Sequence, residues 1–173
     1  MQNYVFNNSF LTPLSTVDAS VEAANNGIFY TISTGLQLVS SASGFLVFQL
    51  TNPANSGKTL QLRSVRTGSF NSTIIDIFRN STFTGGTSII PRNTNYSFTD
   101  ASIATAKYLA SNTDPTTGGT LLQTVQQANG SATFDYDGRV IIPGSAANQT
   151  FYVRLTNSGT TTNMATTVSW WEY

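Results

Sequence analysis

Short runs of alternating apolar and polar residues make up most of the chain, and Gly, Asn, Ser and Pro separate them. Such runs predict β-strands, because successive side chains on a strand point to opposite faces of a sheet. Helical periodicity is nearly absent: only residues 100–110 could be drawn as a helix, and they lack a sustained apolar stripe. The pattern predicts about ten strands, at residues 27–32, 36–39, 44–51, 59–66, 73–79, 88–90, 121–125, 138–142, 149–155 and 165–173.

The alternation also predicts which side chains form the core. Residues 44–51 are apolar at nearly every position, so both faces of that strand are expected to be buried. In residues 149–155, Tyr152 and Arg154 are expected to point outward. The predicted core consists of Phe45, Phe48, Leu60, Leu62, Ile75, Ile77, Val140, Ile142, Phe151, Val153 and Leu155.

The fold class that follows is all-β, a single antiparallel β-sandwich for which we expect jelly-roll connections. Turn dipeptides such as Asn129-Gly130 and Asp137-Gly138 separate the runs, as in sandwiches and barrels. No shift in composition marks a domain boundary. We therefore expect an extended N-terminal arm at residues 1–24 and one β-sandwich domain at residues 25–173.

Composition excludes several classes of function. The chain has eight cationic and eight acidic residues and a net charge of zero, so it lacks the basic surface that binds nucleic acid or anionic membranes. No apolar run is long enough to span a bilayer. His and Cys are both absent, which removes the commonest general base, the thiolate nucleophile and the commonest metal ligands.

Two short motifs suggest a ligand, and each has a simpler structural interpretation. Residues 52–59 resemble a phosphate-binding loop, but Asn52 occupies the position of its first glycine and a predicted strand follows, so a hairpin loop is expected. Asp135 and Asp137 would point the same way on a strand, as in part of a calcium site. A turn at Asp137-Gly138 is the alternative, because no other acidic residue is nearby in the sequence.

The remaining carboxylates are scattered, and their spacing selects no acid–base pair. Without His, the many Ser and Thr hydroxyls have no usual base to activate them. We therefore expect no enzyme activity, and we assign no catalytic residue, no metal ligand and no cofactor.

The segment at residues 170–173 is the most unusual in the chain. On a strand, Trp170 and Trp171 point to opposite faces, so one fills the core and the other needs a cover. That cover is supplied by loops of the same chain, by a neighbouring subunit, or by a sugar bound on an aromatic platform. We take Trp170, Trp171 and Tyr173 as candidate interface residues.

The N-terminal arm is rich in apolar side chains, among them Tyr4, Phe6 and Phe10. Tyr4 and Phe6 alternate about Val5 as in a short strand. Because an apolar arm left in water promotes aggregation, we expect it to reach a neighbouring chain or a larger shell, with Tyr4, Phe6 and Phe10 as interface residues. An edge strand of its own domain is the alternative.

Several segments together carry a resemblance to a known group of proteins. They are the Asn52-Pro53 to Ser56-Gly57-Lys58 hairpin, residues 78–82, residues 84–87 leading to 91–95, residues 136–143 and the terminal Trp170-Trp171-Glu172. In this order they resemble small β-rich structural proteins of tailed bacteriophages, of the head decoration or head fibre type. The resemblance covers about residues 44 to 173 and implies a virion component; it carries no catalytic residues.

From these features we expect a non-enzymatic virion structural protein, a decoration or cement protein on the outer surface of a phage head. Its partners would be other copies of itself, a trimer being favoured, and the major capsid protein or another virion protein. Two alternatives stay open. One is an extracellular fibre or pilus subunit that uses its arm for strand exchange. The other is a carbohydrate-binding sandwich that uses Trp171 or Tyr152.

Overall fold

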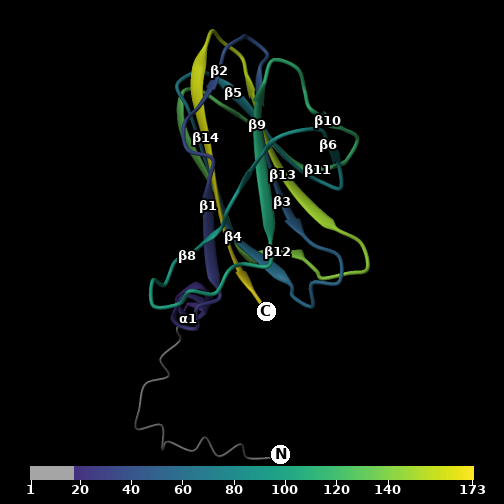
Figure 1. The fold of residues 1–173 in the computed structure, drawn as a ribbon. Helices are drawn as coiled ribbons and strands as arrows, with labels where there is room; N and C mark the ends of the chain where they lie inside the picture. The colour runs from purple at the N-terminus through teal and green to yellow at the C-terminus, as the bar shows by residue number, and fades with distance from the viewer. Residues whose placement is uncertain (1–17) are drawn as a thin grey trace, which may run out of the picture.

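The computed structural model describes residues 18–173, which form two antiparallel β-sheets packed face to face (Figure 1). One short helix, α1 (Ala19–Asn25), precedes the strands. The first sheet, called sheet A here, has the strand order β12-β4-β14-β1-β8, with β2 paired to β14. Its strands are β1 (Phe29–Ser33), β2 (Gln37–Val39), β4 (Leu60–Ser69), β8 (Arg92–Asn93), β12 (Gly130–Ile142) and β14 (Thr162–Glu172).

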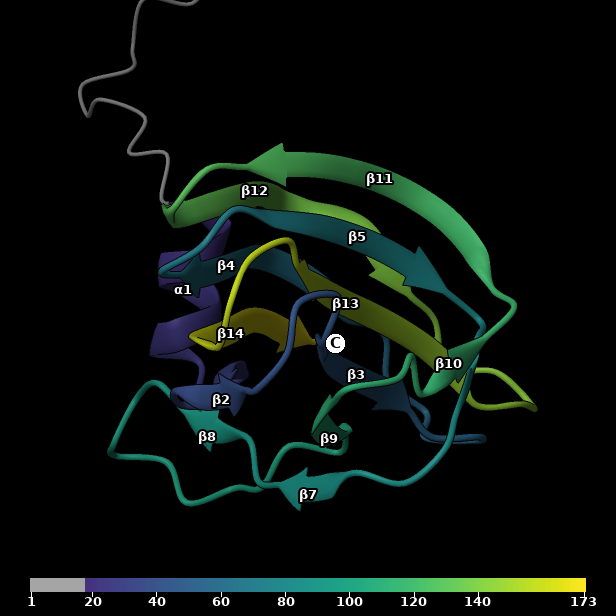
Figure 2. The same cartoon turned by 90° about the horizontal axis from the view of Figure 1, so that it is seen from above.

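The opposing sheet, sheet B, has the order β11-β5-β13-β3-β9-β7. Its strands are β3 (Phe45–Asn52), β5 (Thr73–Arg79), β7 (Thr87–Ile89), β9 (Thr105–Ser111), β11 (Thr120–Gln127) and β13 (Gln149–Asn157). A small third sheet pairs β6 (Thr82–Phe83) with β10 (Thr116–Thr117). The all-β antiparallel sandwich predicted from the sequence is therefore confirmed. Figure 2 shows β11 and β12 side by side along one edge of the sandwich.

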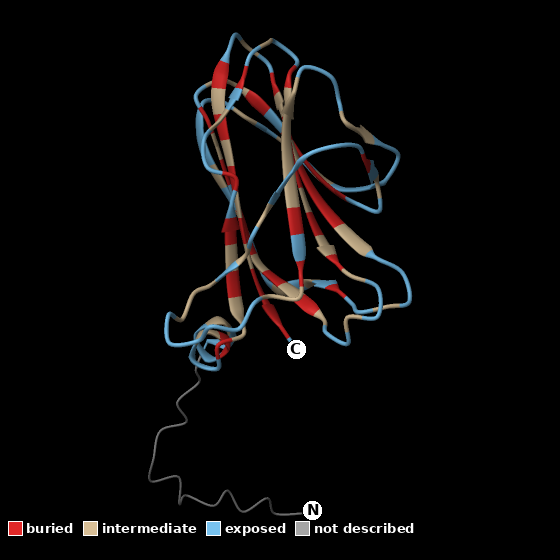
Figure 3. Ribbon diagram, in the orientation of Figure 1, coloured by how far each residue is buried: buried red, intermediate tan, exposed pale blue. Residues whose placement is uncertain are grey.

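The main core fills the space between the two sheets (Figure 3). It includes the predicted Leu60 and Leu62 of β4 and Val153 and Leu155 of β13, all fully buried. Every predicted core residue is buried except Phe45 and Val140, which are half-buried. In β4, β5, β12 and β13 the alternation of apolar residues identified the inward face correctly, because only one face of each strand meets the opposite sheet. Phe45 of β3 is the exception, since it packs on the outer face of sheet B.

A second, smaller apolar cluster lies on the outer face of sheet B. It contains Val47, Phe78, Phe83 and Tyr152, beneath the segments that carry β6 and β10. The Tyr152 ring stacks on Phe78 with a centroid separation of 4.9 Å. This cluster explains why both faces of β3 are buried, as predicted. It also buries Tyr152, whose side chain points away from the core as expected but is not exposed.

The sequence patterns misplaced two elements. Residues 105–111, which overlap the stretch 100–110 considered for a helix, form strand β9, which pairs with β3 along its whole length from Thr105 to Ser111. Conversely, the last part of the predicted arm is helical: Asp18 is the N-cap residue of α1, and its side chain accepts a 2.8 Å hydrogen bond from the Ser20 amide. Hydrogen bonds from the Ser20 hydroxyl and amide lower the pKa of Asp18. An aspartate that caps free N–H groups is a frequent helix start.

Candidate functional site

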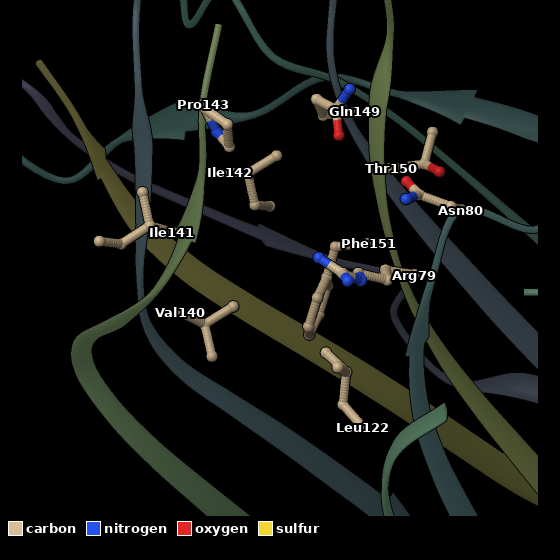
Figure 4. Close-up of a pocket in the computed structure, with 10 residues that line it drawn as sticks. All are labelled: Arg79, Asn80, Leu122, Val140, Ile141, Ile142, Pro143, Gln149, Thr150 and Phe151. Carbon is tan, nitrogen blue, oxygen red and sulfur yellow. The ribbon is translucent and has the colours of Figure 1, made fainter. Parts of the chain in front are cut away.

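A pocket of about 300 Å³ lies where the two sheets part between β12 and β11. Sheet A contributes the end of β12, from Val140 to Pro143, and sheet B contributes Leu122 of β11 and the ends of β5 and β13. Val140 and Ile142 point toward Phe151 and Leu122, whereas Ile141 points to the other side of β12 (Figure 4). Because Ile142 and Phe151 belong to the core, the pocket opens directly onto the interior of the sandwich.

The polar groups of this pocket are few and lie on one side. They are Arg79 and Asn80 at the end of β5, and Gln149 and Thr150 at the start of β13. Within residues 18–173, Arg79 forms no ion pair, and no carboxylate lines the pocket. An amide, a hydroxyl and a guanidinium can donate to carbonyl oxygens, so the lining suits an apolar group that carries peptide-like acceptors. It offers no pair of groups for acid–base chemistry.

The two long strands beside the pocket, β11 and β12, are edge strands of their sheets. β11 pairs only with β5 and β12 only with β4, so the outer edge of each strand is unpaired within the described part of the chain. Leu121, Leu122 and Ile141 are exposed around this opening. Sequence reasoning missed the site, since its residues come from four separate segments and only the Leu121-Leu122 pair gave a local signal.

The two tryptophans predicted as interface residues are both buried by their own chain. Trp170 is in the main core, and Trp171 lies on the outer face of sheet A with only 3% of its surface exposed. Trp171 donates a 3.0 Å hydrogen bond to Gln61 and packs against the Phe29 ring. Other residues of the same chain therefore cover both tryptophan side chains, and neither requires a partner subunit to bury it.

One glycine is required for this cover. Gly138, at the irregularity of β12, has φ +81°, a conformation that residues with a Cβ rarely adopt. A Cβ at this position would lie 2.7 Å from the Trp171 ring. The Asp137-Gly138 turn thus lets the β12 backbone approach Trp171 closely, which accounts for a turn at this point better than metal binding does.

The remaining sequence candidates fall in three different places. Tyr4, Phe6 and Phe10 lie outside the described residues. Tyr173 is exposed, although its backbone pairs with Thr59. Asp135 and Asp137 both contact Arg63, and Arg139 lies 3.6 Å from Asp137, so cations of the chain itself occupy their oxygens.

No cluster of three or more possible metal ligands occurs within residues 18–173. The 52–59 segment joins β3 of sheet B to β4 of sheet A, so the expected hairpin loop is wrong and the segment is a connection between the two sheets. It leads into a strand and lacks the helix of a phosphate-binding loop.

A second group of charges has a structural role on sheet B. Arg154 of β13 binds Asp76 at 2.8 Å and also contacts Asp114, which precedes β10. Thr124 of β11 donates a 2.7 Å hydrogen bond to the same Asp76. These contacts link β11 to its neighbour β5 and hold the segment before β10 against the outer face of sheet B, and both carboxylate oxygens of Asp76 have a partner.

No helix in the described part has the length and apolar content to cross a membrane.

Comparison with known proteins identifies no relative of this chain. No family model, no curated protein and no solved structure matches the sequence or the fold.

Proposed function

We propose that this protein is a non-enzymatic structural component of a virion, a decoration protein that binds the outer surface of a phage head as a homo-oligomer. The observation that carries the proposal is the order of the strands. The sets β12-β4-β14-β1 and β11-β5-β13-β3 follow the order in which a jelly roll arranges its two sheets. Jelly rolls are frequent among viral capsid domains, and also among lectins. The resemblance of residues 44–173 to phage structural proteins favours a viral structural protein over a lectin.

Exposed apolar side chains at one end of sheet A supply a surface for such binding. Leu36 and Leu38 belong to the β2 segment, and Phe70 follows the end of β4; all three are more than half exposed. β2 and the end of β4 flank the same part of β14, because Met164 pairs with both Gln37 and Ser69. Large apolar side chains gathered at one end of a sandwich are a usual feature of a protein contact surface. We propose that this end faces the capsid or a second copy.

The proposal is tested on particles from the source of the protein. Antibody-gold labelling in the electron microscope should place the native protein on phage heads, and purified protein should sediment with heads that lack it. Leu38→Asp and Phe70→Asp should each weaken that co-sedimentation at least tenfold. Tyr96→Asp, at a fully exposed loop position, is the matched control and should have no effect. Native protein found only free of particles would overturn the proposal.

The oligomeric state requires a separate measurement. We propose a trimer, which light scattering of the purified protein at high concentration should detect as three times the chain mass. A monomer at every concentration would limit the proposal to binding by single copies.

Of the two alternatives, carbohydrate binding loses the side chains proposed for it, since Trp171 and Tyr152 have no exposed face. The fibre subunit requires the N-terminal arm to join a neighbouring chain. It would be supported if a protein that lacks residues 1–15 folds with unchanged stability but no longer assembles.

A further inference from the structure

Arg79 is the one charged residue in the inward-facing row of β5, where Ile75 and Ile77 precede it and are buried. It pairs in register with Phe151 of β13, and directly opposed residues on neighbouring strands point to the same face of a sheet. Since Phe151 is a core residue, Arg79 also points into the space between the sheets. Figure 4 shows its side chain reaching toward Phe151, among the residues that line the pocket. A cation therefore lies at the end of an apolar row, where the sandwich opens.

No acidic residue balances this charge. All eight acidic residues of the chain lie within residues 18–173, and Arg79 forms no ion pair with any of them. The lining of the pocket contains no other charged residue. A guanidinium beside apolar side chains binds an anion more strongly than one surrounded by water, because the local dielectric constant is lower. The pocket therefore suits a ligand with a negative charge.

The rest of the pocket is apolar. Val140 and Ile142 of β12 face inward, because they pair with buried leucines of β4. Leu122 of β11 and Phe151 line the side that belongs to sheet B. Burial of one methylene group against such side chains increases affinity roughly fourfold. The ligand therefore has an apolar body as well as a charged group.

Two neutral donors lie on the same side of the pocket as Arg79. Asn80 follows it directly in a left-handed conformation with φ +55°, and the Asn80 backbone amide donates to the Thr150 carbonyl at 3.2 Å. This contact keeps the side chains of Asn80 and Thr150 next to each other (Figure 4). An amide and a hydroxyl both donate to the oxygens of an anion. One guanidinium with two neutral donors matches the single charge of a carboxylate better than the double charge of a phosphate.

The volume of the pocket sets the size of the apolar body. The pocket measures about 300 Å³. At roughly 30 Å³ for one water-sized unit, this space holds on the order of ten non-hydrogen atoms. An aliphatic acid of about eight carbon atoms has this size, whereas a lipid with two long chains exceeds it.

We propose that this pocket binds a small aliphatic monocarboxylate. Arg79, Asn80 and Thr150 hold the carboxylate, and the chain of the ligand lies between Val140 and Leu122. The inference goes beyond the proposed structural role. It is tested on purified protein without phage particles, so its failure would leave that role unaffected.

Calorimetry with three probes tests the proposal. Octanoate carries both parts of the ligand, acetate only the charged group, and 1-octanol only the chain. We expect octanoate to saturate one site per chain and to bind at least tenfold more tightly than 1-octanol, a difference that one carboxylate–guanidinium contact accounts for. Acetate should give no measurable binding. Absence of saturable octanoate binding below its micelle-forming concentration would overturn the proposal, as would equal affinities for octanoate and 1-octanol.

A first pair of variants locates the carboxylate. Arg79→Gln should weaken octanoate binding at least tenfold and leave 1-octanol binding unchanged. Arg66→Gln removes the same charge from an exposed position on sheet A and should alter neither. An equal effect of both variants would show that octanoate responds only to the overall charge, and would overturn the site.

A second pair of variants locates the chain of the ligand. Leu122→Ala should weaken octanoate and 1-octanol at least threefold, because both lose apolar contact. Leu121→Ala changes the neighbouring exposed leucine, which does not line the pocket, and should alter neither. Equal effects at both leucines, with unchanged circular dichroism, would place the ligand elsewhere and contradict the proposal.

The same chemistry occurs at the C-terminus of a peptide that ends in an apolar residue. N-acetylleucine, which combines a carboxylate with a peptide group and a branched side chain, separates this source from a free acid. We expect it to bind less tightly than octanoate, because its peptide group would lose water against apolar side chains. Tighter binding than octanoate would assign the pocket to a peptide C-terminus and overturn the assignment to a free acid.

Discussion

The Trp170 indole donates a 3.0 Å hydrogen bond to the carboxylate of Glu172, two residues further along β14. Glu172 is buried, and its other oxygen accepts from the Ile103 amide at 3.2 Å. The Ser102 hydroxyl donates to the same Glu172 oxygen as the Trp170 indole. One side chain near the C-terminus therefore joins sheet A to the segment that leads into β9 of sheet B.

Replacing Glu172 should destabilise the fold, because buried donors would lose their acceptor. Each unsatisfied buried group costs roughly 1–3 kcal/mol. We expect Glu172→Ala to lower the free energy of unfolding by about 3 kcal/mol, measured by urea denaturation. Glu172→Gln keeps one acceptor oxygen and should lose less. Glu22→Ala, on the exposed side of α1, is the control; an equal loss in both would contradict the role of Glu172.

Val153 tests the packing between the sheets. It is fully buried and pairs with Phe48 on one side and Ile77 on the other. Val153→Ala removes two methyl groups and leaves a cavity, so we expect a loss of roughly 1–3 kcal/mol in the free energy of unfolding. Val21→Ala, the same change at an exposed helix position, should alter it by less than about 0.5 kcal/mol. A similar effect at both positions would contradict the assigned core.

The half-buried Tyr136 predicts a loss of stability in alkali. Burial raises the pKa of its phenol from the ordinary 10.0 to about 12. The folded chain thus holds this proton more tightly than the unfolded chain does, and the resulting stability is complete below pH 10 and is lost as the pH rises toward 12. Its size is no more than about 2 kcal/mol, because solvent screens a half-exposed group.

The measurement compares unfolding free energies at pH 9 and pH 11.5. Tyr136→Phe should show a smaller decrease than the natural chain over this interval. Tyr96→Phe, which removes a fully exposed phenol, should behave as the natural chain does. The same decrease in all three proteins would refute the assignment to Tyr136.

Tryptophan fluorescence tests the burial of the C-terminal pair. Since Trp170 and Trp171 are the only tryptophans and both are buried, the native emission should lie at short wavelength and resist quenching by acrylamide. Unfolding in guanidinium should shift the emission to longer wavelength and increase quenching several-fold. Trp171→Phe should leave an emission that is still resistant to quenching. Strong quenching in the native protein would show that one indole is exposed.

The sequence by itself determined the class of fold and the inward faces of the strands. In segments such as residues 59–66 and 149–155, the alternating pattern fixes which face of the strand meets the opposite sheet. A shift of the strand by one residue would turn all of its apolar side chains toward water. Composition likewise limited the chemistry, since a chain without His or Cys offers few catalytic groups.

Tertiary structure decided what local patterns leave undetermined. Residues 105–111 are a strand because β3 supplies a partner, and Tyr152 is buried because Phe78 and Phe83 cover it. Trp171 needed a cover, and only the folded chain shows that Phe29 and the turn at Gly138 provide it. The pocket beside Leu122 combines four segments that are distant in sequence. Contacts of this kind depend on how the sheets are ordered, and strand order arises from long-range pairing that no local alternation encodes.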